Sequence, residues 1–312
     1  MNNLSSAIMS GLHGLATTFG RCSFEYMLDS SLIKAGPITS NSEDAAIAYS
    51  FMSQKEDSHF YSKLYDGGLG GLPSPHLTGF TKIDDLSDVR IGMYSPWFND
   101  SQPHIRDRSY QVVDYLKSKG AKIVEISIPH LAELSLAHGF TISNEFALAY
   151  DLAFSSSSTH LEPSTRVTVA IGRVVTGLEL LAAGKLKHWA FNYLTGLFKE
   201  HSLNAILTPS IGVDVPLFED ASRTYGESDT ALSVLLMKHI SIVNFLGLPA
   251  YTVPIGYLPP DHLHPSEDKS LRLPVGIQLI GDHWTEHKVN YFPLLSRLGD
   301  SFIFSLVTAT WA

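Results

Sequence analysis

The sequence contains one cysteine, no run of basic residues and no internal repeat. Since Cys22 has no second cysteine to pair with, no intramolecular disulfide can form and cysteines cannot build a zinc site. The simplest compartment for such a chain is a reducing one, and we expect a cytoplasmic protein. Lys and Arg total 22 against 31 Asp and Glu, which gives a net charge of −9. Nucleic acid is therefore not an expected partner.

Signals for export and membrane insertion are also weak. The first six residues lack the basic and long apolar regions of a secretory signal. The last part, residues 291–311, is largely apolar, but Arg297 and Asp300 near its centre would each cost about 2.5–3.5 kcal/mol in a membrane. We expect a buried terminal helix or an altered terminus there rather than a membrane span.

The residues that are present predict a globular α/β protein. The chain has 312 residues, of which 44% are hydrophobic and 17% charged. Residues 88–94 and 122–128 alternate like strands on either side of a helical segment at 103–119, which is a βαβ pattern. Further helices are predicted at 142–154, 165–183 and 186–201, and further strands at 205–208, 250–255 and 274–280. We expect a mixed, mostly parallel sheet flanked by helices, with the segments near Val89, Ile123, Ala205, Tyr251 and Gly276 at its centre.

Two local patterns concern the first quarter of the chain. Ser40 can cap a following helix, with Glu43 placed to complete a capping box. The glycine-rich segment at 65–75 predicts a loop, but Pro73 interrupts the G-x-G-x-x-G pattern and no P-loop occurs. The sequence therefore gives no support for a phosphate site.

One motif matches a zinc site in part. His283, Glu286 and His287 fit H-x-x-E-H, in which two histidines bind zinc and the glutamate acts as a base. A third protein ligand is required, and the 25 residues after His287 contain no Glu, no His and a single Asp, Asp300. We expect no metal and no cofactor, and a polar start of a helix at this point.

Candidate nucleophiles are equally weak. Ser31 with Lys34 and Ser266 with Lys269 fit S-x-x-K, but the spacing arises often by chance and no G-x-S-x-G elbow is present. Several histidines in polar or proline-flanked contexts are expected on the surface: His104, His130, His201, His262 and His264. No catalytic residue is assigned from local motifs.

A series of short motifs in a fixed order carries a family resemblance. They are Gly-Leu-His-Gly-Leu-Ala-Thr-Thr-Phe-Gly-Arg at 11–21, Gly-Pro-Ile at 36–38, Ser-Glu-Asp-Ala-Ala at 42–46, Thr-Pro at 208–209, Asn-Phe-Leu-Gly-Leu-Pro-Ala at 244–250, Val-Pro-Ile-Gly at 253–256 and Leu-Pro-Val-Gly-Ile-Gln-Leu-Ile-Gly at 273–281, with Glu286 beyond. Over about residues 7–288 the chain resembles the amidase signature family. Residues 91–100 and 137–142 are most similar to its fatty acid amide hydrolases of the plant type and their microbial relatives. The resemblance implies a single domain at 1–288 lacking its N-terminal catalytic part, followed by an apolar tail at 289–312.

The matched motifs also have physical roles in a scaffold. Gly11 and Gly14 permit close backbone packing, Pro249 and Pro254 delimit a strand, and Gly276 lets another backbone approach. Gln278, a polar residue on an apolar strand, fits a satisfied core amide better than a catalytic group.

The resemblance also implies which groups are missing. The family uses a Ser–Ser–Lys triad, and its nucleophile lies nine residues before the first glycine of the Gly-x-x-Gly element, a spacing that lands on Asn2. The lysine, the bridging serine and the oxyanion backbone would precede Met1. Ser5 and Ser6 are displaced from the expected place, and Ser10 stands where a cysteine is usual. We therefore expect the chain to be inactive as given, with no catalytic residue of its own.

The expected function is amide hydrolysis by resemblance, on fatty acyl or other carboxamides. The alternative is a non-catalytic binding or regulatory pseudoenzyme that holds an apolar ligand or pairs with a full-length homologue. Expected partners are a small-molecule amide or apolar ligand, with a homodimer and peripheral membrane contact left open. A fatty acyl substrate predicts an apolar tunnel, whereas the simpler interpretation is core packing, for the same residues: Phe146, Leu152, Leu180, Leu181, Trp189 and Phe191.

Overall fold

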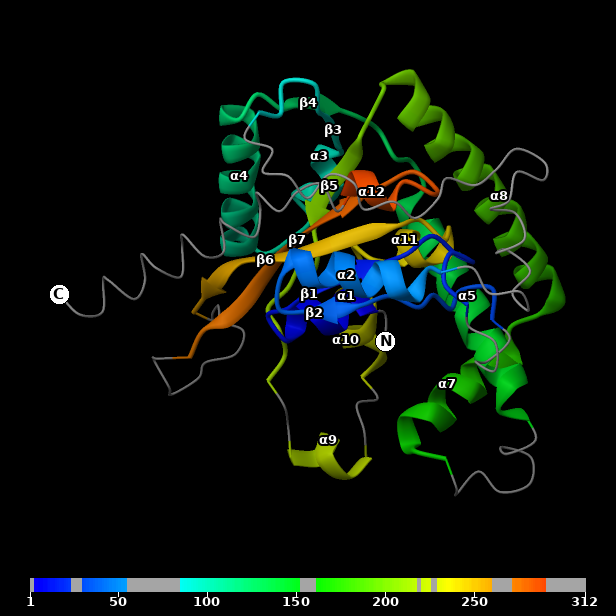
Figure 1. Cartoon of the computed structure of the whole chain (residues 1–312). Coiled ribbons are helices and arrows are strands. Elements are labelled where there is room, and N and C mark those ends of the chain that lie inside the picture. Colours follow the sequence, from blue (N-terminus) through cyan, green and yellow to red (C-terminus); the bar gives the residue numbers. More distant parts are fainter. Residues whose placement is uncertain are drawn as a thin grey trace.

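A single mixed sheet organises the protein (Figure 1). The computed structural model describes residues 3–23, 30–54, 85–151, 161–217, 220–225, 229–259 and 271–289. Seven strands follow the order β2-β1-β6-β7-β5-β3-β4. Their bounds are β1 (His13–Ala16), β2 (Ile38–Thr39), β3 (Arg90–Met93), β4 (Lys122–Glu125), β5 (Ala205–Pro209), β6 (Ala250–Leu258) and β7 (Leu273–Ile280). All five segments expected in the sheet belong to it, but β4 lies at an edge rather than the centre.

Strand directions correct one part of the predicted fold. β3 pairs in parallel with β4 and with β5, so the βαβ unit is confirmed. The other four pairings among the described strands are antiparallel. The mixed sheet is therefore confirmed, and the expectation that it is mostly parallel is wrong. The physical reason is that β6 and β7, consecutive in the chain, pair with each other, and β7 then adds antiparallel to β5.

Helices cover both faces of this sheet. Their bounds are α1 (Asn3–Met9), α2 (Ser42–Met52), α3 (Ser95–Phe98), α4 (Pro103–Ser118), α5 (Leu131–Ala149), α7 (Pro163–Val174), α8 (Gly177–Glu200), α9 (Asp220–Tyr225), α10 (Thr230–Met237), α11 (Ser241–Phe245) and α12 (Glu286–Val289). Residues of α1, α5, α8 and α11 form one apolar cluster with one face of the sheet. Residues of α2 and α4 form a second cluster with the opposite face.

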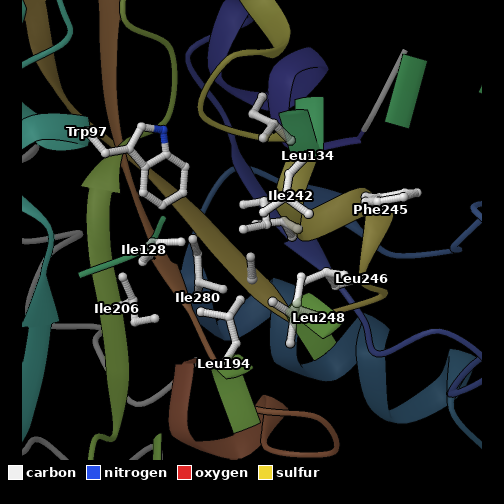
Figure 2. Packing of buried hydrophobic residues seen from close by; sticks show 14 of the residues in the cluster. Trp97, Ile128, Leu134, Leu194, Ile206, Ile242, Phe245, Leu246, Leu248 and Ile280 are labelled. Carbon is white, nitrogen blue, oxygen red and sulfur yellow. The ribbon is translucent and has the colours of Figure 1, made fainter. Parts of the chain in front are cut away.

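Successive side chains along each strand point to opposite faces of the sheet, and this produces the two clusters. In β5, Ile206 belongs to the first cluster and Leu207 to the second, as the two-residue period of a strand requires. Figure 2 shows the first cluster, where Ile206 and Ile280 of the sheet lie close to Leu194 of α8 and Leu248. Both faces are buried, which explains why the strand sequences are short apolar runs.

Several helix boundaries differ from the predicted ones. The cap of α2 is Asn41, whose side chain accepts from the backbone N–H of Asp44, so the assignment to Ser40 and Glu43 is wrong by one residue. α5 begins at Leu131, eleven residues earlier than expected. The break between the next two helices lies at Val175 and Thr176 rather than near residue 184, because Thr176 and Glu179 form a capping box that begins α8.

Two proline and glycine assignments also change. Pro249 precedes β6, but Pro254 lies inside it, at an irregularity in the pairing with β7. A Cβ on Gly276 would lie 2.0 Å from the side chain of Ile8, so a side chain of α1 approaches this glycine rather than another backbone. Both residues still act in the scaffold.

Among the described residues, no single helix has the length and apolar composition to cross a membrane. α7 and α8 reach that composition only together, and the chain bends by 94° between them. The tail at 291–311 and the glycine-rich segment at 65–75 lie outside the described residues.

Candidate functional site

The beginning of α1 is the part of the structure next to the position expected for the family nucleophile. Residue 2 itself lies outside the described residues, and Asn3 is the first residue of α1. The Asn3 side chain donates to the carbonyl of Leu15 at 2.7 Å. A Cβ on Gly14 would lie 2.7 Å from that of Ala7, and one on Gly36 would lie 1.9 Å from the Leu15 oxygen. The backbone oxygen of Asn3 would lie 3.3 Å from the same Cβ on Gly14, so the predicted close backbone packing at Gly14 is confirmed, and Gly36 has the same role.

The S-x-x-K pair near this corner is not assembled. Ser31 is exposed and its hydroxyl donates to Glu145 at 2.6 Å. The Lys34 amine donates instead to the carbonyls of Leu248 and Val243, at 2.6 and 3.2 Å. Because the two side chains have different partners, Lys34 does not serve as a base for Ser31 in this arrangement. The second such pair, Ser266 with Lys269, lies outside the described residues.

A row of polar side chains crosses the sheet beneath α1. The strand register pairs Thr252 with Gln278 and Gln278 with Thr208, so the three lie on one face. The Ser210 hydroxyl is hydrogen-bonded to that of Thr252. The Gln278 amide donates to the carbonyls of His239 and Pro209. Gln278 is fully buried, as a core amide should be, but its Oε1 has no partner among the described residues.

The H-x-x-E-H motif has a different arrangement from a zinc site. The Glu286 carboxylate forms an ion pair with Arg21 at 3.2 Å and accepts from the backbone N–H of Thr18 at 2.8 Å. His283 Nε2 is hydrogen-bonded to the Leu246 carbonyl. Among the described residues, no group of three His, Cys, Asp or Glu side chains could hold a metal. The motif thus begins the short helix α12 and joins it to the segment that follows β1.

The Arg21–Glu286 pair is one of the interactions that local sequence patterns did not reveal. Both side chains are almost completely buried, at 1% and 2% exposure. The guanidinium also lies over the ring of Trp284, 4.8 Å from its centre. The two charged residues are 265 positions apart, so no short motif in the sequence could have paired them.

A second group of polar residues surrounds α11. His138 is hydrogen-bonded to Asn244 at 2.7 Å, and the Asn244 amide donates to the carbonyl of Leu32 at 2.9 Å. Burial lowers the pKa of His138, with Lys187 adding to the effect and Glu145 opposing it. A neutral imidazole here can therefore accept or donate one hydrogen bond without bringing a charge into the core.

His239 and Tyr251 are further buried groups whose ionisation is suppressed. Burial lowers the pKa of His239 to about 4, and its Nε2 is hydrogen-bonded to the Trp97 carbonyl at 3.1 Å. Burial also raises the pKa of the Tyr251 hydroxyl far above its ordinary value. Its oxygen lies 2.8 Å from His13 Nδ1. These groups stay neutral near pH 7 and act in the scaffold.

The surface assignment of the histidines needs two corrections. His130 is exposed, as expected, and its ring contacts that of Trp189 edge-on. His104, however, is half-buried and lies 2.8 Å from the buried carboxylate of Asp214. His201 is half-buried, and His262 and His264 lie outside the described residues.

Three of the residues proposed for an apolar tunnel do not belong to the core. Leu181, Trp189 and Phe191 are exposed, and Phe146 and Leu180 are half-buried, while Leu152 lies outside the described residues. For Leu181, Trp189 and Phe191 the interpretation as ordinary core is therefore wrong. The tunnel itself stays a prediction.

Comparisons with known proteins identify the scaffold. The family model described as "Amidase" matches residues 7–289. A fatty acid amide hydrolase of Medicago truncatula is 31% identical over 288 residues, covering 89% of this chain and 44% of that protein. A 2-amino-5-chloromuconic acid deaminase of Comamonas testosteroni is 27% identical over 280 residues, covering 88% of this chain and 53% of the other.

Solved structures agree on the fold. A crystal structure of an amidase superposes with a TM-score of 0.70 at 18% identity, covering 96% of this chain and 62% of the other. A bacterial aryl acylamidase superposes with a TM-score of 0.67 at 18% identity, covering 94% of this chain and 59% of the other. The chain spans less than half the length of the plant fatty acid amide hydrolases that it matches.

Proposed function

Because the chain belongs to the amidase family, we propose that it carries the scaffold of a carbon–nitrogen hydrolase that acts on linear carboxamides, with fatty acyl amides as its substrate class. The observation that supports this proposal is the family match over residues 7–289 together with 31% identity to a fatty acid amide hydrolase. The supporting geometry is the close packing of α1, β1 and the loop at Gly36, next to the position that the resemblance gives to the nucleophile.

We further propose that this chain, as given, does not hydrolyse amides by itself. Amide hydrolysis by a serine needs a nucleophile, a base and an oxyanion site together. Asn2 occupies the position that the family spacing gives to the serine. Ser31 and Lys34, which have the spacing of a nucleophile and its base, bind different groups.

The test is an activity assay on the purified full chain with a long-chain acyl amide and a short aromatic amide, alongside labelling by a fluorophosphonate probe. We expect turnover no higher than the buffer control and no labelled serine. Asn2→Ser should not restore turnover, because a lone serine hydroxyl is too weakly acidic to attack without a base. Labelling of Ser5, Ser6 or Ser31, with that residue required for hydrolysis, would instead show a relocated nucleophile.

Substrate class can be tested by binding alone. A non-hydrolysable long-chain amide analogue should bind more tightly than a short aromatic amide, because a long acyl chain removes more apolar surface from water when it binds. Titration calorimetry on the same preparation gives both affinities. A preference for the short amide would contradict the fatty acyl class without affecting the family assignment.

The second candidate function is a non-catalytic binding or regulatory protein. The observation that favours it is the separation of Ser31 from Lys34 described above. In this case the chain holds an apolar ligand, forms a homodimer or pairs with a full-length homologue. Adding the chain to a full-length plant fatty acid amide hydrolase and measuring both complex formation and turnover separates this function from the first. A cytoplasmic location is proposed for either function, since the one cysteine, Cys22, has no second cysteine with which to form an intramolecular disulfide.

Peripheral membrane contact is a further part of the proposal, and one surface supports it. The most exposed apolar residues of the corner between α7 and α8 are Val174 at 76%, Leu178 at 80% and Leu181 at 67%. In Figure 1 the two helices lie at the right of the molecule. Apolar side chains gathered on such a corner are typical of a surface that contacts lipid or another protein.

A further inference from the structure

Four polar side chains are buried together on one face of the sheet. They are Thr208, Ser210, Thr252 and Gln278, and each is at most 1% exposed. The strand register places Thr208 and Thr252 on either side of Gln278. Thr208 follows Ile206 by two residues, so the row lies on the face that carries the first apolar cluster. Buried polar atoms in such surroundings cost free energy unless each has a hydrogen-bond partner.

Two of the hydroxyl groups are bonded to each other across Gly276. The Ser210 N–H donates to the Gly276 carbonyl at 2.9 Å, and the Ser210 hydroxyl is hydrogen-bonded to that of Thr252. The Thr252 hydroxyl donates in turn to the Ile277 carbonyl at 3.3 Å. Because a hydroxyl has a single hydrogen, Ser210 is the donor in its bond to Thr252. The Ser210 oxygen can therefore still accept a hydrogen bond.

The side-chain amide of Gln278 has a fixed orientation. The two groups that it contacts are the carbonyls of His239 and Pro209, so its nitrogen, the only donor, faces them. Its Oε1 then points elsewhere and accepts no hydrogen bond from the described part of the chain. The hydroxyl oxygen of Thr208 also has no partner among the described residues. One of these two buried atoms belongs to a hydroxyl with a hydrogen to donate, and the other can only accept.

Thr208 and Gln278 lie directly opposite each other where β5 pairs with β7. The backbone bond from Ser210 to Gly276, two residues along each strand, makes this a hydrogen-bonded pair. Such pairs are the wider kind in an antiparallel sheet, with Cα atoms about 5.5 Å apart. The Thr208 hydroxyl and Gln278 Oε1 are not bonded to each other. We propose that one water molecule is bound between them, where it accepts a hydrogen bond from Thr208 and donates one to Gln278 Oε1.

Water suits this site better than an ion or an apolar molecule. A buried water forms about two to four hydrogen bonds, and here its second hydrogen can be donated to the oxygen of Ser210. The four polar side chains are neutral, so they offer a buried ion no counter-charge. An apolar molecule would leave Thr208 and Gln278 without the hydrogen bonds that they need. The bound water thus links the side chains of β5 and β7 inside the apolar cluster.

The direct test is a crystal structure of the whole chain. We expect electron density for one water molecule within about 2.5–3.2 Å of both Thr208 Oγ1 and Gln278 Oε1. Thr208→Val, which replaces the hydroxyl by a methyl group of similar size, should abolish this density. Thr208→Ser, which keeps the hydroxyl, should retain it. A direct hydrogen bond between Thr208 and Gln278, a side chain that fills the space between them, or a water that persists in Thr208→Val would overturn the proposal.

Unfolding in urea tests the same site in solution, because a bridged and an unpaired hydroxyl predict effects of opposite sign. If water joins Thr208 to Gln278, Thr208→Val should lower the ratio of folded to unfolded protein roughly fivefold, as the loss of one hydrogen bond does. Removal of an unpaired buried hydroxyl would raise this ratio instead.

The matched control is Thr252→Val, which removes a hydroxyl with direct partners and should lower the ratio whether or not the water is bound. A Thr208→Val protein more stable than the wild type, beside a destabilised Thr252→Val protein, would overturn the proposal. None of these measurements depends on amide hydrolysis, so this inference and the proposed function fail separately.

Discussion

Two opposite charges lie inside the protein where Arg21 meets Glu286. A buried ion pair gains from its mutual attraction but loses the hydration of both groups, so its net contribution to stability is small. Removing one partner is different, because the remaining charge stays buried without compensation. The pair joins the segment after β1 to α12, and it is supported by the Thr18 N–H and the ring of Trp284.

Glu286→Gln should therefore lower the free energy of unfolding by about 3–5 kcal/mol, since Arg21 loses its counter-charge. The measurement is denaturant unfolding followed by circular dichroism. The control is Asp107→Asn, which removes the exposed partner of Arg106. That change should alter the free energy of unfolding by less than about 0.5 kcal/mol. Equal effects of the two substitutions would contradict this account of the buried pair.

Because of His239, the free energy of unfolding should depend on pH in the acidic range. Its pKa in the folded state, about 4, lies below the ordinary 6.5 of an unfolded chain, because burial and Lys238 disfavour the charged ring while Asp100 and the Trp97 carbonyl favour it. The unfolded state thus binds the proton first as the pH falls. The stability associated with neutral His239 is complete above about pH 6.5 and is lost progressively towards pH 4.

Between pH 7 and pH 4.5 this one group should reduce the free energy of unfolding by about 2 kcal/mol. His239→Gln keeps a donor for the Trp97 carbonyl and removes the titration. Urea unfolding at both pH values should show a loss of stability that is about 2 kcal/mol smaller in the variant than in the wild type. Identical losses in both proteins would show that His239 is not the group responsible.

At this scale the sequence predicted types of residue better than their partners. The scaffold roles of Gly14 and of buried Gln278 followed from the pattern of glycines and from an amide on an apolar strand. The contacts of Glu286 and Lys34 could not be predicted, because their partners lie 265 and 214 positions away and only the fold brings them together. A short motif gives spacing along the chain, and spacing alone does not determine what a side chain meets.

The elements were predicted where periodicity is local. β3, α4 and β4 agree with the expected βαβ unit because alternation and helical spacing persist over whole segments. β1 was not predicted as a strand. It has only four residues, and two of them, His13 and Gly14, do not contribute to an apolar alternation that could be recognised in the sequence. The boundary between α7 and α8 was misplaced although Thr176 and Glu179 form a capping box, a signal that is visible in the sequence.

Helix packing offers a matched pair of glycines for a test. In α7, a Cβ on Gly172 would lie 1.9 Å from the Ser143 carbonyl oxygen of α5 and 2.7 Å from the Ala147 Cβ. In α8, a Cβ on Gly184 would meet nothing within 4 Å. Both residues lie inside helices, so the helix propensity gained on substitution by alanine is the same and only the packing differs.

Gly172→Ala should lower the free energy of unfolding by about 1–3 kcal/mol, because α7 must move away from α5. Gly184→Ala should raise it by about 0.5–1 kcal/mol through helix propensity. Thermal unfolding of the two variants provides the comparison, and hydrogen exchange should show faster exchange in α7 for Gly172→Ala only. If both variants became more stable, the close contact between α5 and α7 would be wrong.

For the whole molecule, topology was the harder part to predict. Each strand expected in the sheet is there, yet β7 lies between β6 and β5 and pairs antiparallel with both, and β1 pairs antiparallel with β2 and β6. Alternation of helices and strands along a chain favours parallel neighbours, but it does not say which strand inserts between two others. The family resemblance gave the fold class, and the order of the strands came from the structure.

The corner between α7 and α8 is the surface from which we expect the whole molecule to contact lipid. Moving an exposed leucine side chain from water into an apolar environment contributes about 1.5–3 kcal/mol, so Val174, Leu178 and Leu181 together can support reversible binding. The protein should sediment with neutral phosphatidylcholine vesicles. Leu178→Glu should weaken this partition at least tenfold, because it removes one such contribution and adds the cost of burying a charge.

The control is Phe51→Glu, which changes an equally prominent apolar residue, 70% exposed, on α2. If Phe51→Glu weakened vesicle binding as much as Leu178→Glu, the corner would have no special role; if the wild-type protein stayed in the supernatant, lipid contact would be excluded as the reason for its exposed apolar surface.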